Sequence, residues 1–595
     1  MRLDITETTI GLQRFDAREG LDPKQYGWGG WLNKLNLQLG WGKWTVGTRV
    51  DSSLYWLRPI DRSFCESGCR FSPQEAPALA TIDSASYRNS VYLAKAWVTY
   101  KAPGVEITGG DAYAQLGRGL VLSMRKIDEL GIDTTVRGAK ISIQKDPVAV
   151  QLLAGVANPA RVDEATGSAL FKTKAIDDDP RSVRPLFGTD LVVGGEIAAG
   201  RGGPVIAATR MAHFVRCAPY GYRSDGTLDA SFGSTLFGSC AGADRDTWLS
   251  GLSGALNPLL RARNITQVGQ SFEVPNLWGH GNLYIEGAIQ DRSIEGETDP
   301  NQKQGNALYG SLVNNFGPVT TTLEMKSYRN YYAIPAAVDA SRAVPFTTVQ
   351  YSNLPTTELL IQDSMFGFFN ACVNGGRLRT DVRLTPGFLV YGTAGYYYSK
   401  SELSAGRCDR FGRTVDSGGG PDGTHTRVYD GQTGVEWRFD KDRSQVLFSL
   451  GVRNDRFART DNPFYNERSL NYSISIFLKG PFSFELYGRH RIRYQESENL
   501  RGPDGAIREV PWAQGFHTTA LKIAPKWVFA QGIEYYTLLG QPATYLNGQL
   551  LYRFTSESNV KVLVGQQQGG LRCISGVCRV FPAFEGVRAE LTLRF

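Results

Sequence analysis

No long hydrophobic run occurs anywhere in the chain of 595 residues. A membrane-spanning helix needs about 18 or more consecutive apolar residues, so the sequence predicts none. The mean hydropathy of −0.26 also differs from that of a helical membrane protein. The first residues form neither the charged nor the apolar part of a signal peptide, and we expect the sequence to be a mature or trimmed form.

Signatures of catalysis and of metal binding are equally scarce. The 5 histidines form no pair at a metal-binding spacing, and there is no nucleophile elbow, phosphate loop or haem-attachment motif. The acidic run 177–179 lacks the spaced oxygen ligands and the glycine of a dedicated calcium loop. We therefore expect no enzyme activity, no cofactor and no metal site. The net charge of +7 is modest for this length and does not indicate a nucleic-acid partner.

What the chain has in abundance is glycine, with 67 residues, and short segments that alternate between apolar and polar residues. In the closing segment Val587, Leu591 and Phe595 face one way, while Arg588 and Glu590 face the other. The same alternation recurs at 35–41, 435–439, 482–487 and 560–564. A last strand that ends in Phe595 resembles the assembly signal of bacterial outer-membrane barrels. The alternative is the edge strand of a soluble sandwich.

The connections between these segments are of two kinds. Short turns are expected at 42–43, 102–104, 145–147, 317–318, 386–387, 440–443, 479–481 and 555–558. Long polar connections are expected at 57–90, 157–187, 217–266, 332–376, 401–424, 495–513 and 568–582. This alternation is typical of periplasmic turns and extracellular loops.

Tracing the chain strictly up and down from a first strand near residues 5–15 gives roughly 24 strands, with 22 to 26 allowed, and both termini at the periplasmic side. We predict one domain, residues 1–595, that forms a single transmembrane antiparallel β-barrel in a bacterial outer membrane. Its expected partners are membrane lipid, lipopolysaccharide and the barrel-assembly machinery. Tyrosine clusters at 331–332, 396–398 and 535–536 are expected in the aromatic girdles at the membrane interfaces.

The cysteines form couples that are close in sequence and lie in or beside the long connections. Disulfides in an oxidising compartment explain this pattern better than metal binding, because the spacings are not those of zinc sites. The expected couples are Cys65 with Cys69, Cys217 with Cys240, Cys372 with Cys408, and Cys573 with Cys578.

One glycine-rich segment, 109–120, interrupts the alternation. Before it, Val105 and Ile107 place the apolar face on odd numbers, whereas after it Leu120 and Leu122 place that face on even numbers. A slip of one residue predicts a β-bulge and a strand that bends into the lumen. The candidates for a constriction or a docking site are Asp111, Tyr113, Gln115 and Arg118. The alternative is a salt bridge that holds a kinked strand to the wall.

Two strands carry consecutive arginines on the face opposite to their apolar residues. A ladder of inward arginines favours an anion-attracting pathway, because a low-dielectric wall focuses its field. Pairing with acidic residues on neighbouring strands is the alternative, and the nearly balanced charges favour it. The residues of this lumen basic ladder are Arg489, Arg491, Arg493, Arg379 and Arg383.

The segment 110–120, with Leu130 to Asp133 after it and Gly138 in the next strand, resembles a family of large bacterial outer-membrane barrel proteins known only as a domain of unknown function. The tail has the same resemblance at 569–573, Cys578 and 584–595. The resemblance covers roughly 30–157 and 560–595 and implies the fold and the location, but no activity. Family members usually have Asn where this chain has Asp111.

A barrel of this size is too wide to stay open, and no separate plug domain precedes it, which disfavours a TonB-gated receptor. We expect the lumen to be filled by inward loops, chiefly 217–266, or by a periplasmic or lumen-bound protein partner. The leading hypothesis is a pore for passive or selective solute transport. The alternative is a scaffold that houses or anchors partner proteins for conduction, secretion, surface display or motility, and a surface adhesin is a third hypothesis.

Overall fold

The structure is a computed structural model of the whole chain. It describes residues 1–15, 27–57, 87, 89–164, 167, 190–217, 240, 245, 249, 259, 261–298, 300–336, 350–355, 373–399, 426–457, 463–495, 511–537, 543–574, 577–581 and 584–595.

Twenty-four of the strands in these ranges form one sheet. Their bounds are β1 (Arg2–Arg14), β2 (Trp28–Trp41), β3 (Trp44–Leu57), β4 (Ser90–Ala102), β5 (Val105–Ala112), β10 (Thr135–Lys145), β11 (Val148–Asn158), β12 (Leu191–Ala199), β13 (Ile206–Val215), β14 (Asn264–Leu277), β15 (Gly281–Ser293), β16 (Gln304–Phe316), β17 (Val319–Arg329), β18 (Val373–Thr385), β19 (Phe388–Ser399), β20 (Thr426–Phe439), β21 (Ser444–Phe457), β22 (Pro463–Phe477), β23 (Phe482–Gln495), β24 (Trp512–Ile523), β25 (Trp527–Tyr536), β26 (Ala543–Arg553), β27 (Asn559–Gln567) and β30 (Phe584–Arg594).

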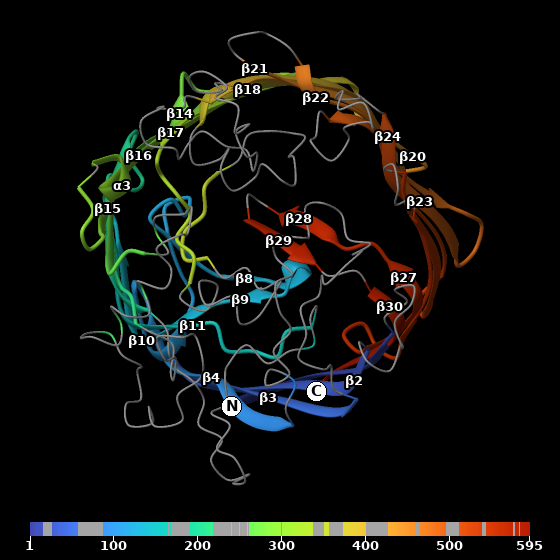
Figure 1. Ribbon diagram of the computed structural model, residues 1–595, viewed down its shortest axis with the longest axis horizontal. Helices are drawn as coiled ribbons and strands as arrows, with labels where there is room; N and C mark the ends of the chain where they lie inside the picture. The colour runs from blue at the N-terminus through green and yellow to red at the C-terminus, as the bar shows by residue number, and fades with distance from the viewer. Residues whose placement is uncertain are drawn as a thin grey trace, which may run out of the picture.

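Each strand pairs antiparallel with the next strand of the sheet, and the last strand closes the sheet on the first. The register of β1 against β30 runs from Thr6 opposite Arg594 to Arg14 opposite Gly586. Phe595 exchanges two backbone hydrogen bonds with Ile5, with N–O distances of 2.9 and 3.1 Å. The closed ring is seen end-on in Figure 1. The prediction of a closed antiparallel barrel of 24 strands is confirmed for the part of the chain described above.

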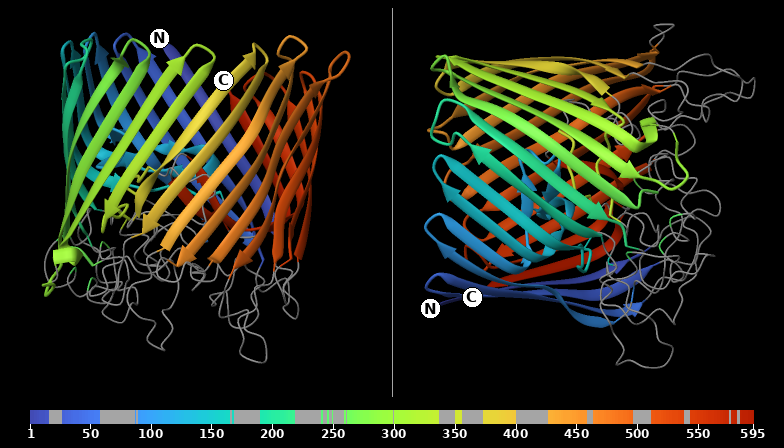
Figure 2. Two further views of the ribbon diagram at one scale, coloured as in Figure 1. Left: turned by 90° about the horizontal axis from the view of Figure 1, so that it is seen from above. Right: turned by 90° about the vertical axis from the view of Figure 1, so that its left-hand side faces the viewer.

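The two rims of the barrel differ. Both termini lie at one rim, where tight turns join the strands (Figure 2). Every predicted short turn falls between two consecutive strands, as at 42–43 between β2 and β3. The strand ends that flank the predicted long connections lie at the opposite rim. Sequence reasoning missed the short turns at 200–205, 278–280 and 524–526.

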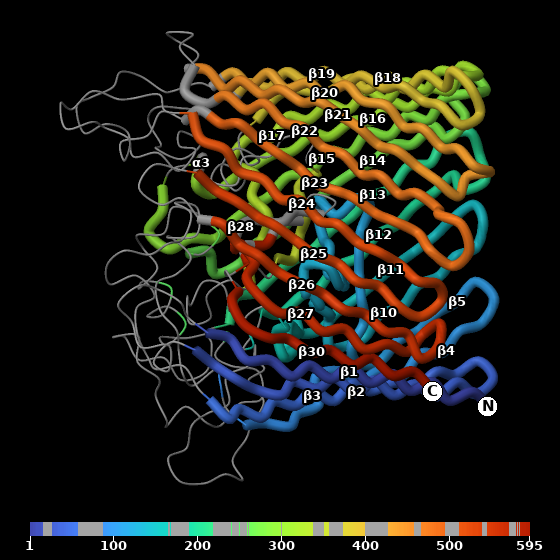
Figure 3. The backbone as a smooth tube through the Cα atoms, turned by 90° about the vertical axis from the view of Figure 1, so that its right-hand side faces the viewer, coloured from blue at the N-terminus to red at the C-terminus, as the bar shows by residue number. Residues whose placement is uncertain are grey.

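The outward face of the wall is apolar between two aromatic levels, and its tilted strands are seen from the side in Figure 3. Near the turn rim, exposed outward side chains include Trp41, Trp44, Trp278, Phe316, Trp437, Trp527 and Phe554. Near the loop rim they include Trp31, Trp56, Tyr396 and Tyr429. Between these levels lie Ile141, Leu152, Ile197, Val268, Ile289, Leu308, Leu450 and Leu546.

The remaining elements lie inside the ring (Figure 1). They are β6 (Ala114–Leu116), β7 (Leu122–Met124), β8 (Lys126–Ile127), the 3-10 helix η3 (Asp128–Leu130), β9 (Ile132–Asp133), β28 (Gly570–Ile574) and β29 (Val577–Phe581). A single helical turn, α3 (Pro300–Lys303), lies near the loop rim. Among the described residues no helix is long and apolar enough to cross a membrane.

Two expectations need correction. The parity change near 109–120 does not arise from a bulge in one continuous strand, because β5 ends at Ala112 and the wall resumes only with β10 at Thr135. The girdle assignment is wrong for Tyr331 and Tyr332, which are buried inside the barrel with 0% and 4% exposure. In the clusters 396–398 and 535–536, successive side chains of a strand face opposite sides of the wall, so only some of these tyrosines face outward. Tyr396 is 46% exposed, whereas Tyr397 is buried.

Candidate functional site

Several connections of the loop rim fold inward and form a plug inside the barrel. Its described segments are 113–134 between β5 and β10, 158–164 after β11, 330–336 and 350–355 between β17 and β18, and the β28–β29 hairpin. We call these segments together the plug. They occupy the half of the barrel nearer the loop rim (Figure 2). The prediction that inward loops fill the lumen thus holds for these segments, whereas most of 217–266 lies outside the described residues.

The plug has a hydrophobic core of its own, which it shares with the wall. Leu116, Leu120, Leu122 and Met124 have 0% exposure and belong to one buried cluster with wall residues of β10 to β20. A backbone hydrogen bond also joins two segments of the plug, because Ser123 N donates to Tyr351 O at 2.7 Å. A core of this kind inside a barrel shows that the plug is packed like a folded domain.

Asp111 lies in the wall at the end of β5, where the chain turns into the lumen. Its carboxylate is buried and accepts five hydrogen bonds of 2.6–3.0 Å. The donors belong to Ala96, Thr135, Arg137 and Asn158. The ladder between β4 and β5 ends at Trp97 opposite Gly110, and beyond it the Asp111 carboxylate accepts the backbone N–H of Ala96 in place of a ladder bond.

The backbone at Gly110 explains part of the glycine signal in this segment. Its φ of +96° is a conformation that L side chains rarely adopt. A Cβ at this position would lie 2.2 Å from the carbonyl oxygen of Ala96, so β4 leaves no room for a side chain. Glycine therefore lets β5 leave the wall without breaking its last contact with β4.

A buried charge cluster attaches the plug to β3 and β4. Asp133 of the plug forms ion pairs with Arg49 and Lys95, and all three are less than 6% exposed. Arg49 also binds Asp51 through two hydrogen bonds of 2.6 and 2.7 Å. Tyr113 donates its hydroxyl to Asp133 at 2.6 Å. Burial alone would raise the pKa of Asp133, but the charges of Lys95 and Arg49 and their hydrogen bonds hold it well below its usual range.

The tip of the plug, at residues 116–119, docks on a second part of the wall, formed by β12, β13 and β15. Gly117 N donates to Glu196 at 3.0 Å and Arg118 N donates to Glu286 at 3.3 Å. Both carboxylates pair with Arg210 of β13. A Cβ on Gly117 would lie 2.6 Å from the Arg210 guanidinium at a φ of +55°, so another residue would strain the backbone and displace the arginine. The plug is therefore held from two sides of the lumen.

The β28–β29 hairpin forms the third attachment. The fully buried Arg579 donates to the carbonyl oxygen of Leu130 at 2.8 Å and forms an ion pair with Asp163. Its guanidinium lies 5.1 Å from the ring centre of Phe581. One side chain from the end of the chain thus joins η3 and the 158–164 segment.

The four residues predicted at the inward bend lie in different places. Asp111 is buried in the wall, whereas Tyr113, Gln115 and Arg118 lie in the plug and are exposed. The Arg118 guanidinium lies 4.2 Å from the ring centre of Tyr284. The chain therefore carries three of these residues into the lumen and keeps the fourth at the wall.

The predicted basic ladder lies on the wall of β18 and β23, away from the attachments of the plug. Arg489, Arg491 and Arg493 all approach Glu467 of β22, at 3.5, 3.7 and 2.9 Å. Arg379 forms a two-pronged pair with Asp381 on its own strand, at 2.7–3.0 Å. Arg383 is exposed near the turn rim. Acidic partners are thus present for most of the ladder, but three arginines share one carboxylate.

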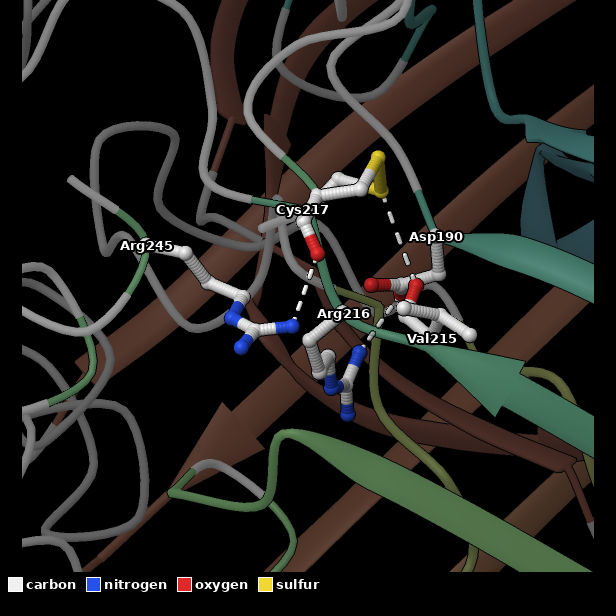
Figure 4. Close-up of a disulfide and its surroundings, with 6 residues drawn as sticks. Asp190, Val215, Arg216, Cys217 and Arg245 are labelled. Carbon is white, nitrogen blue, oxygen red and sulfur yellow. Dashed lines mark hydrogen bonds and ion pairs between the residues drawn. A yellow bond between two sulfur atoms is a disulfide. The ribbon is translucent and has the colours of Figure 1, made fainter. Parts of the chain in front are cut away.

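One of the predicted disulfides is present, between Cys217 and Cys240 (Figure 4). Beside it, Arg216 donates to Asp190 at 2.6 Å and Arg245 donates to the carbonyl oxygen of Cys240 at 2.7 Å. The bridge therefore lies at the loop end of β13. Cys573 and Cys578 are opposite each other in the backbone register of the β28–β29 hairpin. The other predicted couples, Cys65 with Cys69 and Cys372 with Cys408, lie outside the described residues.

Sequence reasoning missed the residues that fix the plug. Asp133, Asp163 and Arg579 were assigned no role, and the contact between the last two joins positions 416 residues apart. A usable signal was the Gly-Ile-Asp run that ends at Asp133, which falls in the resembling segment. Local alternation could not have found the partner of Arg579.

Comparison with known proteins confirms the resemblance to an uncharacterised family. The model of a family of unknown function (DUF6029) matches residues 29–167 and 504–595. These ranges contain the plug segments 113–134 and 158–164, the β28–β29 hairpin and the wall strands beside them. No curated protein sequence matches the chain.

Solved structures give only distant similarities. The siderophore receptor PirA from Pseudomonas aeruginosa is 7% identical, with a TM-score of 0.42 and coverage of 100% of this chain and 80% of that one. The alcaligin outer-membrane receptor FauA from Bordetella pertussis is 6% identical, with a TM-score of 0.39 and coverage of 99% and 76%. An E. coli P pilus tip assembly intermediate is 9% identical, with a TM-score of 0.42 and coverage of 100% and 60%. Identities this low say nothing of a solute or a partner.

Proposed function

We propose that this chain is a bacterial outer-membrane pore for solutes, narrowed by a plug made from its own connections. The observation that carries the proposal is the difference between the two sides of the lumen. On β3, β4, β13 and β15 the lumenal charges are buried under the plug, as at Arg49 and Glu286. On β18 to β24 some lumenal charges remain partly exposed, as at Arg379 and Arg489, although Glu467 and Arg493 nearer the loop rim are buried.

The outer surface supports a membrane location. The aromatic levels are separated by ten residues on β2, from Trp31 to Trp41, and by eight on β25, from Trp527 to Tyr535. With about 3.3 Å per residue and a strand tilt of about 40°, these separations span roughly 20–25 Å. An apolar band of this height between aromatic girdles fits the outer membrane. We assign the short turns to the periplasm and the long loops to the exterior.

The exposed side of the lumen offers a polar path. Its surface combines charged residues, such as Lys522 paired with Glu485, with the half-exposed rings of Tyr487 and Phe516. Asn471 and Gln432 both hydrogen-bond to Ser449, at 3.3 and 2.8 Å, and continue this surface across β20 to β22. A wall of this composition suits small hydrophilic solutes, which pass between the plug and β18 to β24.

The scaffold alternative was motivated by a lumen too wide to leave empty. The plug fills part of that width with the chain's own segments, so a lumen-bound partner is not needed for this purpose. We therefore place the pore first and keep a periplasmic or lumen-bound protein partner as the second proposal. A partner would remain bound, in a fixed ratio to the barrel, during purification in mild detergent.

Single-channel recording in a planar bilayer tests the proposal. We expect the intact barrel to give small conductance steps, and a variant in which a short turn replaces 570–581 to give larger ones, because this change removes Arg579. Migration on unheated gels verifies that both barrels are folded. A folded barrel that conducts in neither form would overturn the pore and leave the scaffold.

A further inference from the structure

Among the described plug residues, Arg161 is the one fully buried arginine that forms no hydrogen bond and no ion pair. It lies in the 158–164 segment, is 2% exposed, and none of its three guanidinium nitrogens reaches a hydrogen-bond acceptor. A guanidinium carries five N–H donors and stays charged. A buried charge without an acceptor is strongly unfavourable, so buried polar groups in proteins are nearly always satisfied.

The groups around Arg161 do not balance its charge. The other cations of this charge network are Arg49 and Lys95 on the wall and Arg579 in the plug, and its carboxylates are those of Asp51, Asp133 and Asp163. Each carboxylate already forms an ion pair with one of those three cations. Within this described set, one positive charge therefore has no counter-charge, and it belongs to Arg161.

Two further buried groups beside this segment also lack a partner among the described residues. Trp28 Nε1 belongs to the same buried cluster as Ala160 and Val162, which flank Arg161. Thr134 Oγ1 follows Asp133, which interacts electrostatically with Arg161. Both groups can donate a hydrogen bond. The shortage in this part of the plug is thus one of acceptors and of negative charge.

We propose that Arg161 binds a small anion inside the plug, a halide or a small oxyanion, and that the bound anion stabilises the closed plug. Arg161 is covered on all sides, so the ligand is small, and an anion supplies both the acceptor and the missing charge. The inference concerns the plug itself and holds whether or not the barrel conducts. A ligand that binds only the closed form shifts the equilibrium toward it.

Hydrogen exchange of the purified full-length barrel tests this proposal. Peptides that cover 128–134 and 158–164 are followed in sodium chloride and in sodium gluconate at equal ionic strength. We expect chloride to slow their exchange about tenfold or more in the wild type. In Arg161→Met we expect no chloride effect. In gluconate we expect slower exchange than in the wild type, because the variant lacks the buried charge that has no counter-charge.

Two further variants keep the test decisive. Arg489→Met removes an arginine from the lumen wall and should leave the chloride effect intact. Arg161→Lys keeps the charge but has fewer donors, and should retain a weaker effect even where the methionine variant does not fold. A wild type that is insensitive to chloride, or an equal effect of chloride in Arg161→Met, would overturn the anion site.

Discussion

Replacing Asp133 by Asn should open the plug while leaving the barrel intact. Asp133 is the acidic partner of Lys95, which is 3% exposed on β4, and it also pairs with Arg49. Arg49 keeps its two hydrogen bonds to Asp51, whereas Lys95 would keep a buried charge without its carboxylate. Removing one member of a buried ion pair typically costs about 3–5 kcal/mol. The lower figure corresponds to a factor of about 100 or more in the ratio of closed to open plug.

The measurement is the mean conductance and open probability of single channels, together with protease cleavage within 113–134. We expect both to rise in Asp133→Asn, while the migration of the folded barrel on unheated gels stays the same. Glu485→Gln is the matched control, because its pair with Lys522 is on the lumen wall away from the plug. It should change neither readout.

A double variant makes the reasoning refutable. Lys95→Met together with Asp133→Asn removes both charges, so it should restore part of the closure that Asp133→Asn loses. If the double variant is more open than Asp133→Asn, the ion pair is not what holds the plug. Wild-type behaviour of Asp133→Asn would refute the attachment itself.

Three other outcomes follow from the same geometry. Gly117→Ala places a Cβ 2.6 Å from the Arg210 guanidinium at a φ of +55°, so it should destabilise the closed plug by about 1–3 kcal/mol and raise the conductance. Unchanged currents would contradict the docking of the plug tip. Because the pKa of Asp133 is lowered in the folded plug, its contribution is complete above the ordinary value near 3.9 and is lost only as the pH falls through the lower folded value. Conductance should therefore stay constant from pH 7 to about 4.5. A rise in conductance that begins near pH 6 would show that the charge cluster around Asp133 does not control plug opening. Arg489→Gln leaves two arginines on Glu467 and should lower the anion-to-cation permeability ratio, measured as a reversal potential in a salt gradient; an unchanged ratio would place the solute path elsewhere.

Much of the wall could be predicted because each strand carries its own signal. Alternation assigned the closing strand with Val587 outward and Arg588 inward, and the structure has Val587 exposed and Arg588 paired with Glu590. Turn residues located the short connections, since Gly42 adopts a φ of +58° between β2 and β3. These features depend on neighbours a few residues apart, which a single sequence contains.

From the sequence, the plug could be predicted only as an interruption of the alternating strand pattern. The sequence indicated an inward bend near Asp111, but it did not show that 22 residues leave the wall between Ala112 and Thr135. The attachments join distant positions, as in the pair between Arg579 and Asp163. The tyrosines at 331 and 332 were misplaced for the same reason, because an aromatic pair beyond a strand end suits a lumenal core as well as a girdle.

The side of the barrel that the plug fills can be recognised from the residue pattern of the wall strands. Where the plug packs, neighbouring wall residues are apolar on both faces. Leu152 is 51% exposed outward and Leu153 is 4% exposed inward, and Val193 and Val192 form a similar couple on β12. A strand of an open pore has no reason to place an apolar side chain in its lumen, because water fills that side. Strands with two apolar faces therefore mark the filled side of the barrel, and strands such as β23, with a polar inner face, mark the side that stays in contact with water.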